Sequence, residues 1–337
     1  MPLEQVVGHR RLVALLSRAV ARNTLPPALL FAGPAGVGKK RVALALAETI
    51  NCTSPKSSEA FERDACGSCA ACRRIARGVY PDVVLLAPGD SGSIKIEPVR
   101  AIIDQANFRP FEARRRVVVI DEADALVEQA QHALLKTLEE PPPASIFLLV
   151  SSLPDALLPT VRSRCPRLRF GPLAPGEVAA ALVRDHGYAE AEARAAAADA
   201  DGSVGRALSA ESADLLDARE TATRVLQQAA RATDPVGRVN TAQDLSPKKG
   251  SPMSERDQLA ACLRIMASVL RDLGLMASRA GDSVLANADM RAELEVLSRS
   301  YDARRTVRAY TAVDEALAAL ERNANAKVVA DWLVLQL

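Results

Sequence analysis

Residues 28–40 read ALLFAGPAGVGKK, and this stretch decides the fold of the first half of the chain. It opens with five apolar residues, which is typical of a strand buried on both faces of a parallel sheet. Gly33, Gly36 and Gly38 follow, and Lys39 opens a segment with helical spacing. In this context backbone N–H groups, the helix dipole and a lysine converge on phosphate oxygens. We therefore predict a phosphate-binding loop for ATP or ADP; the alternative is a plain glycine-rich turn.

The last position of this loop departs from the usual pattern. A Ser or Thr hydroxyl that binds Mg²⁺ is expected there, and this chain has Lys40. An ammonium group has no lone pair for a metal ion, and hydrolysis needs that ion to bridge the β- and γ-phosphates. We therefore expect nucleotide binding to remain possible, with doubtful Mg²⁺ coordination and impaired hydrolysis. The alternative is that Lys40 points into solvent and water completes the Mg²⁺ shell.

Three more apolar runs alternate with helical patterns and predict a parallel sheet with helices on both faces. The runs are residues 82–87, 117–120 and 146–150. Asp121 and Glu122 end the second of these runs, where phosphate-loop enzymes place carboxylates that hold Mg²⁺ through water and polarise the attacking water. The alternative is a solvated acidic strand end. Ser151 or Ser152, at the end of the last run, is placed either to sense phosphate or to cap the next helix.

Four cysteines with the spacing C-x13-C-x2-C-x2-C follow the helical segment that begins at Lys39. They are Cys52, Cys66, Cys69 and Cys72. Four thiolates in a tetrahedron form a closed structural Zn²⁺ site, and no open position is left for catalysis. Buried free thiols and an iron–sulfur cluster are the alternatives. We predict a structural zinc module at about residues 52–78.

Composition and length set further limits. The net charge of +2, with 49% hydrophobic and 25% charged residues, indicates a globular protein and argues against a stand-alone nucleic-acid binder. No apolar run is long enough to cross a bilayer, and the first residues do not resemble a signal peptide. We therefore expect a cytoplasmic protein without a membrane partner. That compartment is reducing, which favours cysteines as metal ligands over disulfides.

A length of 337 residues suits two or three domains, and the strand signal ends near Pro172. We predict an α/β plus all-α chain. Its expected parts are an α/β domain at 1–172, a small helical domain at 173–232, a flexible linker at 233–254 and a helical domain at 255–337. Arg206, at the start of a helix in the second part, faces either nucleotide or solvent.

An arginine-rich turn follows the fourth strand. A guanidinium group binds phosphate in a fork, and Arg164 at a subunit edge could complete a neighbour's site as an arginine finger. The spacing alone favours an ordinary surface arginine in a basic patch.

Five motifs together resemble the AAA+ clamp-loader family of bacterial DNA polymerase III. They are GPAGVGKK (33–40), the cysteine insertion, VVVIDEAD (117–124), ALLKTLEEPP (133–142) and LLPTVRSRC (157–165). The resemblance implies a RecA-like domain, a helical lid and a collar domain for oligomerisation. It also implies a heteropentamer with gamma/tau and delta subunits that loads the beta sliding clamp onto primer–template DNA, as a component of the holoenzyme.

Within that family, Lys40 and the segment 80–100 resemble the delta-prime branch, whose arginine, here Arg164, completes a gamma/tau ATPase site in trans. On this resemblance the chain is not expected to be catalytic alone. Two rivals stay open: an active ATPase motor subunit of the same loader, and a zinc-containing module that binds nucleic acid.

Overall fold

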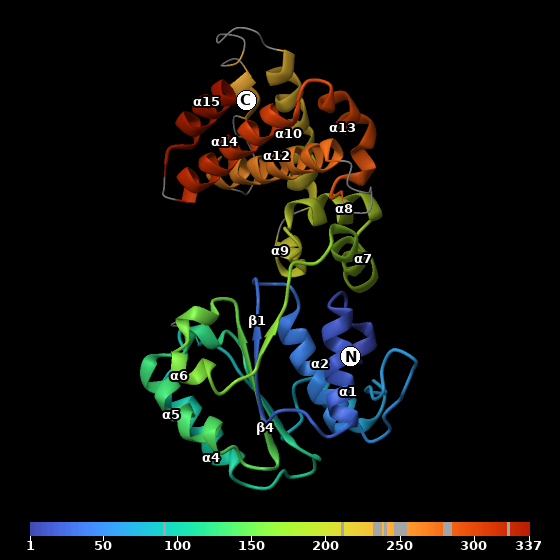
Figure 1. Ribbon diagram of the computed structural model, residues 1–337, viewed down its shortest axis with the longest axis vertical. Helices are drawn as coiled ribbons and strands as arrows, with labels where there is room; N and C mark the ends of the chain where they lie inside the picture. Colours follow the sequence, from blue (N-terminus) through green and yellow to red (C-terminus); the bar gives the residue numbers. More distant parts are fainter. Residues whose placement is uncertain are drawn as a thin grey trace. The chain divides into compact units, whose positions relative to one another are not determined.

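The computed structural model describes residues 1–89, 92–209, 212–231, 238, 241–245, 255–278, 285–321 and 324–337. The chain forms two compact units, Met1–Pro172 and Leu173–Leu337 (Figure 1). The finer division of the second unit into lid, linker and collar stays a prediction. Most of the predicted linker, 233–254, lies outside the described residues.

The first unit is built on a five-stranded parallel sheet with the strand order β2-β3-β4-β1-β5. The strands are β1 (Ala28–Ala32), β2 (Val83–Leu86), β3 (Arg116–Ile120), β4 (Ser145–Ser151) and β5 (Arg167–Arg169). Every residue of the three central strands is buried, which explains their continuous apolar sequence. The predicted α/β class is therefore confirmed. β5 was missed because its three residues, RLR, carry no apolar run.

Helices cover both faces of this sheet (Figure 1). The described helical elements of the unit are η1 (Leu3–Gln5), α1 (Arg10–Ala21), α2 (Lys39–Asn51), α3 (Ala70–Ala76), α4 (Ile96–Ala106), η2 (Ala123–Ala125), α5 (Glu128–Glu139), η3 (Pro154–Ala156) and α6 (Pro159–Arg162). Successive strand residues point to opposite faces: Phe31 packs in one core with α1 and α2, and Leu30 in the other with α4, α5 and α6. The sheet is thus a rigid platform for the loops at its carboxyl edge.

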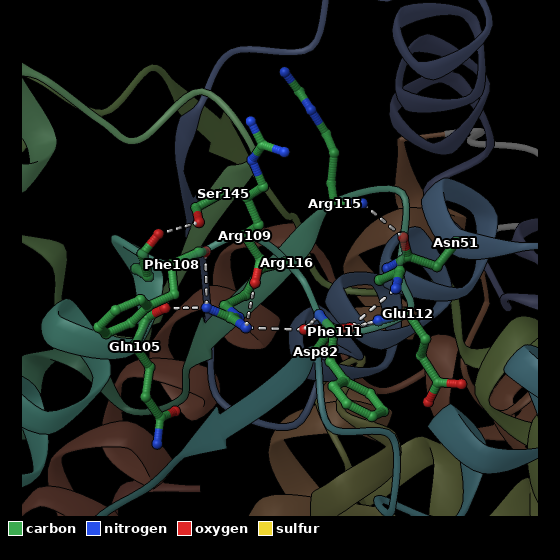
Figure 2. A network of polar contacts seen from close by, with 12 residues as sticks. Asn51, Asp82, Gln105, Phe108, Arg109, Phe111, Glu112, Arg115, Arg116 and Ser145 are labelled. Atoms are coloured by element: carbon green, nitrogen blue, oxygen red, sulfur yellow. Dashed lines mark hydrogen bonds and ion pairs between the residues drawn. The ribbon is translucent and has the colours of Figure 1, made fainter.

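A buried ion pair fixes the loop that precedes β3 (Figure 2). The Asp82 carboxylate is fully buried and accepts backbone N–H bonds from Phe111, Glu112 and Ala113 at 2.9, 2.8 and 3.0 Å. It also accepts a bond from the Arg116 guanidinium at 3.0 Å. Burial alone raises the pKa of this carboxyl, but these hydrogen bonds outweigh that effect and hold the pKa below its usual value.

Helices are the only regular elements of the second unit among the residues that the structure describes. Its elements are α7 (Pro175–His186), α8 (Glu190–Asp199), α9 (Val204–Ser209), α10 (Ser212–Arg231), η4 (Ala242–Leu245), α12 (Glu255–Ala277), η6 (Ala288–Met290), α13 (Arg291–Ser298), α14 (Ala303–Glu321) and α15 (Ala326–Gln336). α12 is the central helix and contacts α8, α10, α13, α14 and α15. Within the range predicted as linker, η4 packs against α10 and α15.

Buried polar groups tie the helices of this unit together. The fully buried carboxylate of Asp272 accepts the backbone N–H groups of Ala286 and Asn287 at 3.1 and 2.8 Å. Arg219 on α10 pairs with Asp289 at 2.8 Å. Among the described helices of the whole chain, none combines the length and the apolar character needed to cross a membrane.

Candidate functional site

The glycine-rich loop joins β1 to α2 and lies at the carboxyl edge of the sheet. The N–H group of Gly33 donates to the carbonyl of Ser151 at 3.3 Å, and a Cβ atom at Gly33 would lie 2.1 Å from the Phe170 carbonyl oxygen. Only glycine fits such an approach. Gly36 and Gly38 have φ values of 72° and 98°, in the left-handed region that favours glycine. All three predicted glycines therefore shape the loop.

The Lys39 side chain folds back along the loop. Its ammonium donates to the carbonyl oxygens of Gly33 and Pro34 at 2.7 and 2.5 Å. Burial lowers the pKa of this ammonium, while the nearby carboxylates of Asp124 and Asp121 act in the opposite direction. The lysine that the motif assigns to phosphate is thus held at the loop, with its charge partly shielded from water.

Lys40 reaches across to the end of β3. Its ammonium nitrogen lies 3.1 Å from a carboxylate oxygen of Asp121, whose side chain is only 14% exposed. Asp121 is fixed in turn by its N–H group, which donates to the Leu86 carbonyl at 2.8 Å. Position 40 therefore offers no hydroxyl and instead places a positive charge against the carboxylate that would hold the metal. These residues do not fit Mg²⁺.

The other acidic residues after β3 lie beside this pair. Glu122 is exposed and has a left-handed φ of 48°, an unusual conformation that is found preferentially at functional sites. Asp124 accepts the backbone N–H of Ser152 at 3.0 Å and so links the ends of β3 and β4. Burial raises the pKa of Asp124, but the nearby Ser151 hydroxyl and hydrogen bonds from backbone N–H groups, that of Ser152 among them, outweigh this and lower the pKa overall.

A cavity of about 640 Å³ brings the loop and the acidic strand end together. Its lining includes the predicted residues Gly36, Gly38, Lys39, Lys40, Asp121 and Glu122, together with Ala35, Arg41, Leu44, Val150 and Ser152. Of the two candidate serines, Ser152 lines the cavity and Ser151 is buried. Arg206 belongs to the second unit and pairs there with Asp201 at 3.1 Å.

Arg164 lies on the turn after α6 and is not among the residues that line this cavity. Its guanidinium pairs with Glu139, the last residue of α5, and donates to the Thr160 carbonyl at 2.8 Å. Val161 and Cys165 on either side are buried in the core, and burial raises the pKa of the Cys165 thiol to about 11. The turn is therefore anchored by apolar residues and displays Arg164 at the surface.

The four predicted cysteines come together between α2 and α3. The sulfur atoms of Cys52, Cys66, Cys69 and Cys72 all lie within 4.8 Å of one another. Backbone N–H groups donate to three of these sulfurs at 3.2–3.5 Å, an arrangement that stabilises thiolates. Burial alone raises the pKa of Cys69, but hydrogen bonds from Thr53 and Cys72 bring it down to about 5. The cluster is compatible with a structural zinc site.

Comparisons with known proteins agree with this geometry. A family model described as "DNA polymerase III, delta subunit" matches residues 8–174, which cover the sheet, the loop, the cysteines and the Arg164 turn. The first unit, which this model spans almost completely, belongs to the DNA polymerase III clamp-loader family of AAA+ proteins. The family resemblance predicted from the motifs is confirmed.

Members of two branches of this clamp-loader family match equally well. The delta' subunits of Pseudomonas aeruginosa and Bacillus subtilis are 37% and 34% identical over 153 and 173 residues, or 45% and 51% of this chain. The tau subunit of Bacillus subtilis is 35% identical over 167 residues, or 50% of this chain. The matches span 45%, 50% and 28% of these three relatives, in that order. Identity therefore does not separate delta' from gamma/tau.

Two solved structures from Thermotoga maritima are similar over most of the chain. A gamma subunit-related protein is 18% identical, with a TM-score of 0.41, and the match covers 95% of this chain and 96% of that one. The RuvB Holliday junction branch migration motor is 18% identical, with a TM-score of 0.42 and 86% of both chains covered.

Two residues that support the site were not predicted. The His9 ring nitrogen Nε2 lies 3.0 Å from the Val37 carbonyl of the loop, and the ring packs edge-on against Phe170 at 4.9 Å between centroids. No sequence pattern marks His9. Glu139, the partner of Arg164, stands inside the motif ALLKTLEEPP, which was the one available signal.

Proposed function

We propose that this chain is the delta-prime subunit of a DNA polymerase III clamp loader and that it serves a neighbour's ATPase site in place of its own. The observation that carries this proposal is the ion pair between Lys40 and Asp121 at 3.1 Å. Hydrolysis requires a metal ion that bridges the β- and γ-phosphates, and this pair replaces both the hydroxyl and the charge that would hold the ion. The chain's own ATP hydrolysis is therefore impaired.

Arg164 acts in trans in this proposal. A finger for a neighbouring site should be displayed at the surface, away from the chain's own cavity, and Arg164 meets both conditions. Its guanidinium would stabilise the charge that develops on the transferred phosphoryl group at a gamma/tau site. The contact with Glu139 keeps the side chain ordered until the neighbour docks.

We assign a structural Zn²⁺ ion to the cysteine cluster. Cys52, Cys66, Cys69 and Cys72 would hold it, and four thiolates leave no open position for a reacting water. When bound, the ion cross-links the insertion to the end of α2. Its role in this proposal is stability of the module, not catalysis.

Two exposed surfaces support a role inside an assembly with gamma/tau and delta. Val328, Trp332 and Leu335 follow one face of α15 at spacings of four and three residues and are 66%, 38% and 41% exposed. We assign this face to the collar contact among subunits. In the first unit, Phe108 and Phe111 are 71% and 84% exposed on the loop that Asp82 and Arg116 fix (Figure 2). Such exposed apolar groups mark interaction sites.

In the assembled ring, this subunit would help gamma/tau open the beta sliding clamp and place it on primer–template DNA. The test is reconstitution with gamma/tau and delta, followed by measurement of ATP turnover with clamp and primed DNA. An arginine finger raises kcat by a factor of about 10³–10⁵. Arg164→Ala should therefore abolish hydrolysis at the one ATPase site that Arg164 completes and leave the other sites active.

The matched control for this test is Arg162→Ala, at the last residue of α6, two residues before Arg164 and paired with Asp155. It should leave turnover unchanged. Gel filtration checks that both variants still assemble. Full turnover of the assembled Arg164→Ala loader would overturn the trans role.

A further inference from the structure

Lys40 and Asp121 occupy the two positions from which related sites hold a metal ion. In phosphate-loop enzymes the ion is bound by the loop Ser or Thr and by the Asp at the end of the acidic strand. Here those positions are Lys40 and Asp121, and they contact each other directly at 3.1 Å. A single positive charge from the protein therefore lies where a divalent cation is expected.

We propose that this loop binds the phosphates of a nucleoside diphosphate or triphosphate without a divalent cation, with the Lys40 ammonium in the ion's place. The inference rests on the phosphate-binding role that the sequence predicts for this loop, and it is consistent with the proposed loss of hydrolysis. Phosphate loops usually bind nucleotide together with a divalent cation. Here the Lys40 side chain prevents metal-dependent hydrolysis, and the same side chain makes the metal ion unnecessary for binding.

The charges around the cavity support this inference. Its lining contains three cationic side chains, Lys39, Lys40 and Arg41, and two carboxylates, Asp121 and Glu122. The lining residues alone thus carry one excess positive charge without any metal, and the Asp124 carboxylate beside Lys39 balances it. The loop glycines add backbone N–H groups and α2 adds its N-terminal dipole, which both favour phosphate. The volume of about 640 Å³ lies within the range of small-ligand sites.

A divalent cation would bind weakly at this site. To reach Asp121 it would have to displace or closely approach an ammonium group, and like charges repel strongly at such distances. Lys40 is 46% exposed, so its flexible stem can turn its ammonium from Asp121 toward a phosphate without leaving the cavity. Added Mg²⁺ should therefore not strengthen binding.

The experiment measures the affinity of the full chain for a fluorescent ADP analogue, with ordinary ADP as competitor, in Mg²⁺ and in excess EDTA. The wild-type Kd should be the same in both buffers within about threefold. Lys40→Thr restores the hydroxyl and removes the charge. In EDTA it should bind about tenfold or more weakly than wild type, since a hydrogen bond to a charged group is lost. Mg²⁺ should restore its affinity.

Two further variants separate charge from shape. Lys40→Met keeps the side-chain length but offers neither charge nor hydroxyl, so it should bind weakly in both buffers. Lys136→Met removes an exposed lysine on α5, outside the cavity, and should behave as wild type. Electron paramagnetic resonance of Mn²⁺ gives a readout independent of affinity: with ADP, Lys40→Thr should immobilise the ion and wild type should not.

Wild-type affinity that falls tenfold or more in EDTA would overturn the proposal, and so would undetectable ADP binding in both buffers. These wild-type results need no mutation, so a misfolded variant cannot obscure them. The trans role of Arg164 is measured on the assembled loader by a different substitution, so either proposal can fail while the other stands.

Discussion

Substituting Asp82 with Asn should destabilise the first unit strongly. The carboxylate is fully buried and accepts three backbone N–H bonds and one guanidinium bond, all at 2.8–3.0 Å. In Asp82→Asn the amide nitrogen opposes some of these donors, and the Arg116 guanidinium loses its counter-charge in the core. Removing one partner of a buried ion pair costs about 3–5 kcal/mol of the free energy of unfolding. We expect a loss in that range.

The matched control is Glu112→Gln in the same loop. The Glu112 carboxylate pairs with Arg74 at 2.6 Å, but both side chains are more than a third exposed. A surface pair contributes about 0–1 kcal/mol, so this variant should be near wild type. Urea unfolding of the full chain, followed by far-UV circular dichroism, compares the two. Trp332, the only tryptophan, lies in the second unit and reports on that unit separately by fluorescence.

The pH dependence of Asp82 has a definite sign. Because the folded-state pKa is lowered, the ionised carboxylate contributes stability that is fully present above the unfolded pKa, near 3.9. That contribution is lost as the pH falls toward the folded pKa. The stability difference between wild type and Asp82→Asn should therefore shrink under acid. If Asp82→Asn destabilises no more than Glu112→Gln at neutral pH, the buried pair does not hold this loop.

Three other substitutions test other parts of the structure. Cys72→Ser, or treatment with a chelator, should release one Zn²⁺ per chain as measured by atomic absorption and lower the melting temperature; a metal-free wild type would refute the zinc assignment. Gly33→Ala forces a Cβ atom to within 2.1 Å of the Phe170 carbonyl oxygen. It should lower the free energy of unfolding in urea by about 1–3 kcal/mol and weaken ADP binding. Wild-type stability of this variant would show that the loop can move to make room for the added atom. Glu139→Gln removes the negative charge that pairs with Arg164. Because the pair is partly exposed, ATP turnover of the assembled loader should change by about fivefold or less. A loss of turnover as large as that of Arg164→Ala would show that the Glu139 charge is indispensable.

The sequence predicted the features that depend on local order. The strand–loop–helix around Gly33 and Lys39 is read from contiguous residues, and so is the alternation of buried strands. The two successive x2 spacings of the cysteines bring three sulfurs together by local geometry, and the structure places Cys52 with them. The resemblance to the clamp-loader family followed from the order of such local motifs.

Contacts between distant segments were not predictable in the same way. Lys40 meets Asp121 although β4 separates β3 from β1 in the sheet order, and no spacing in the sequence reveals this contact. The same holds for the approach of His9 to Val37 and for the pair between Arg164 and Glu139. These partners become visible only when the sheet order and the helix positions are known.

ATP turnover by the purified chain alone, with excess Mg²⁺, tests the central claim most directly. Because Lys40 occupies the metal position, we predict a rate no higher than that of Lys39→Ala measured in parallel. Sustained Mg²⁺-dependent hydrolysis that disappears in Lys39→Ala would show an active motor subunit and would contradict the account.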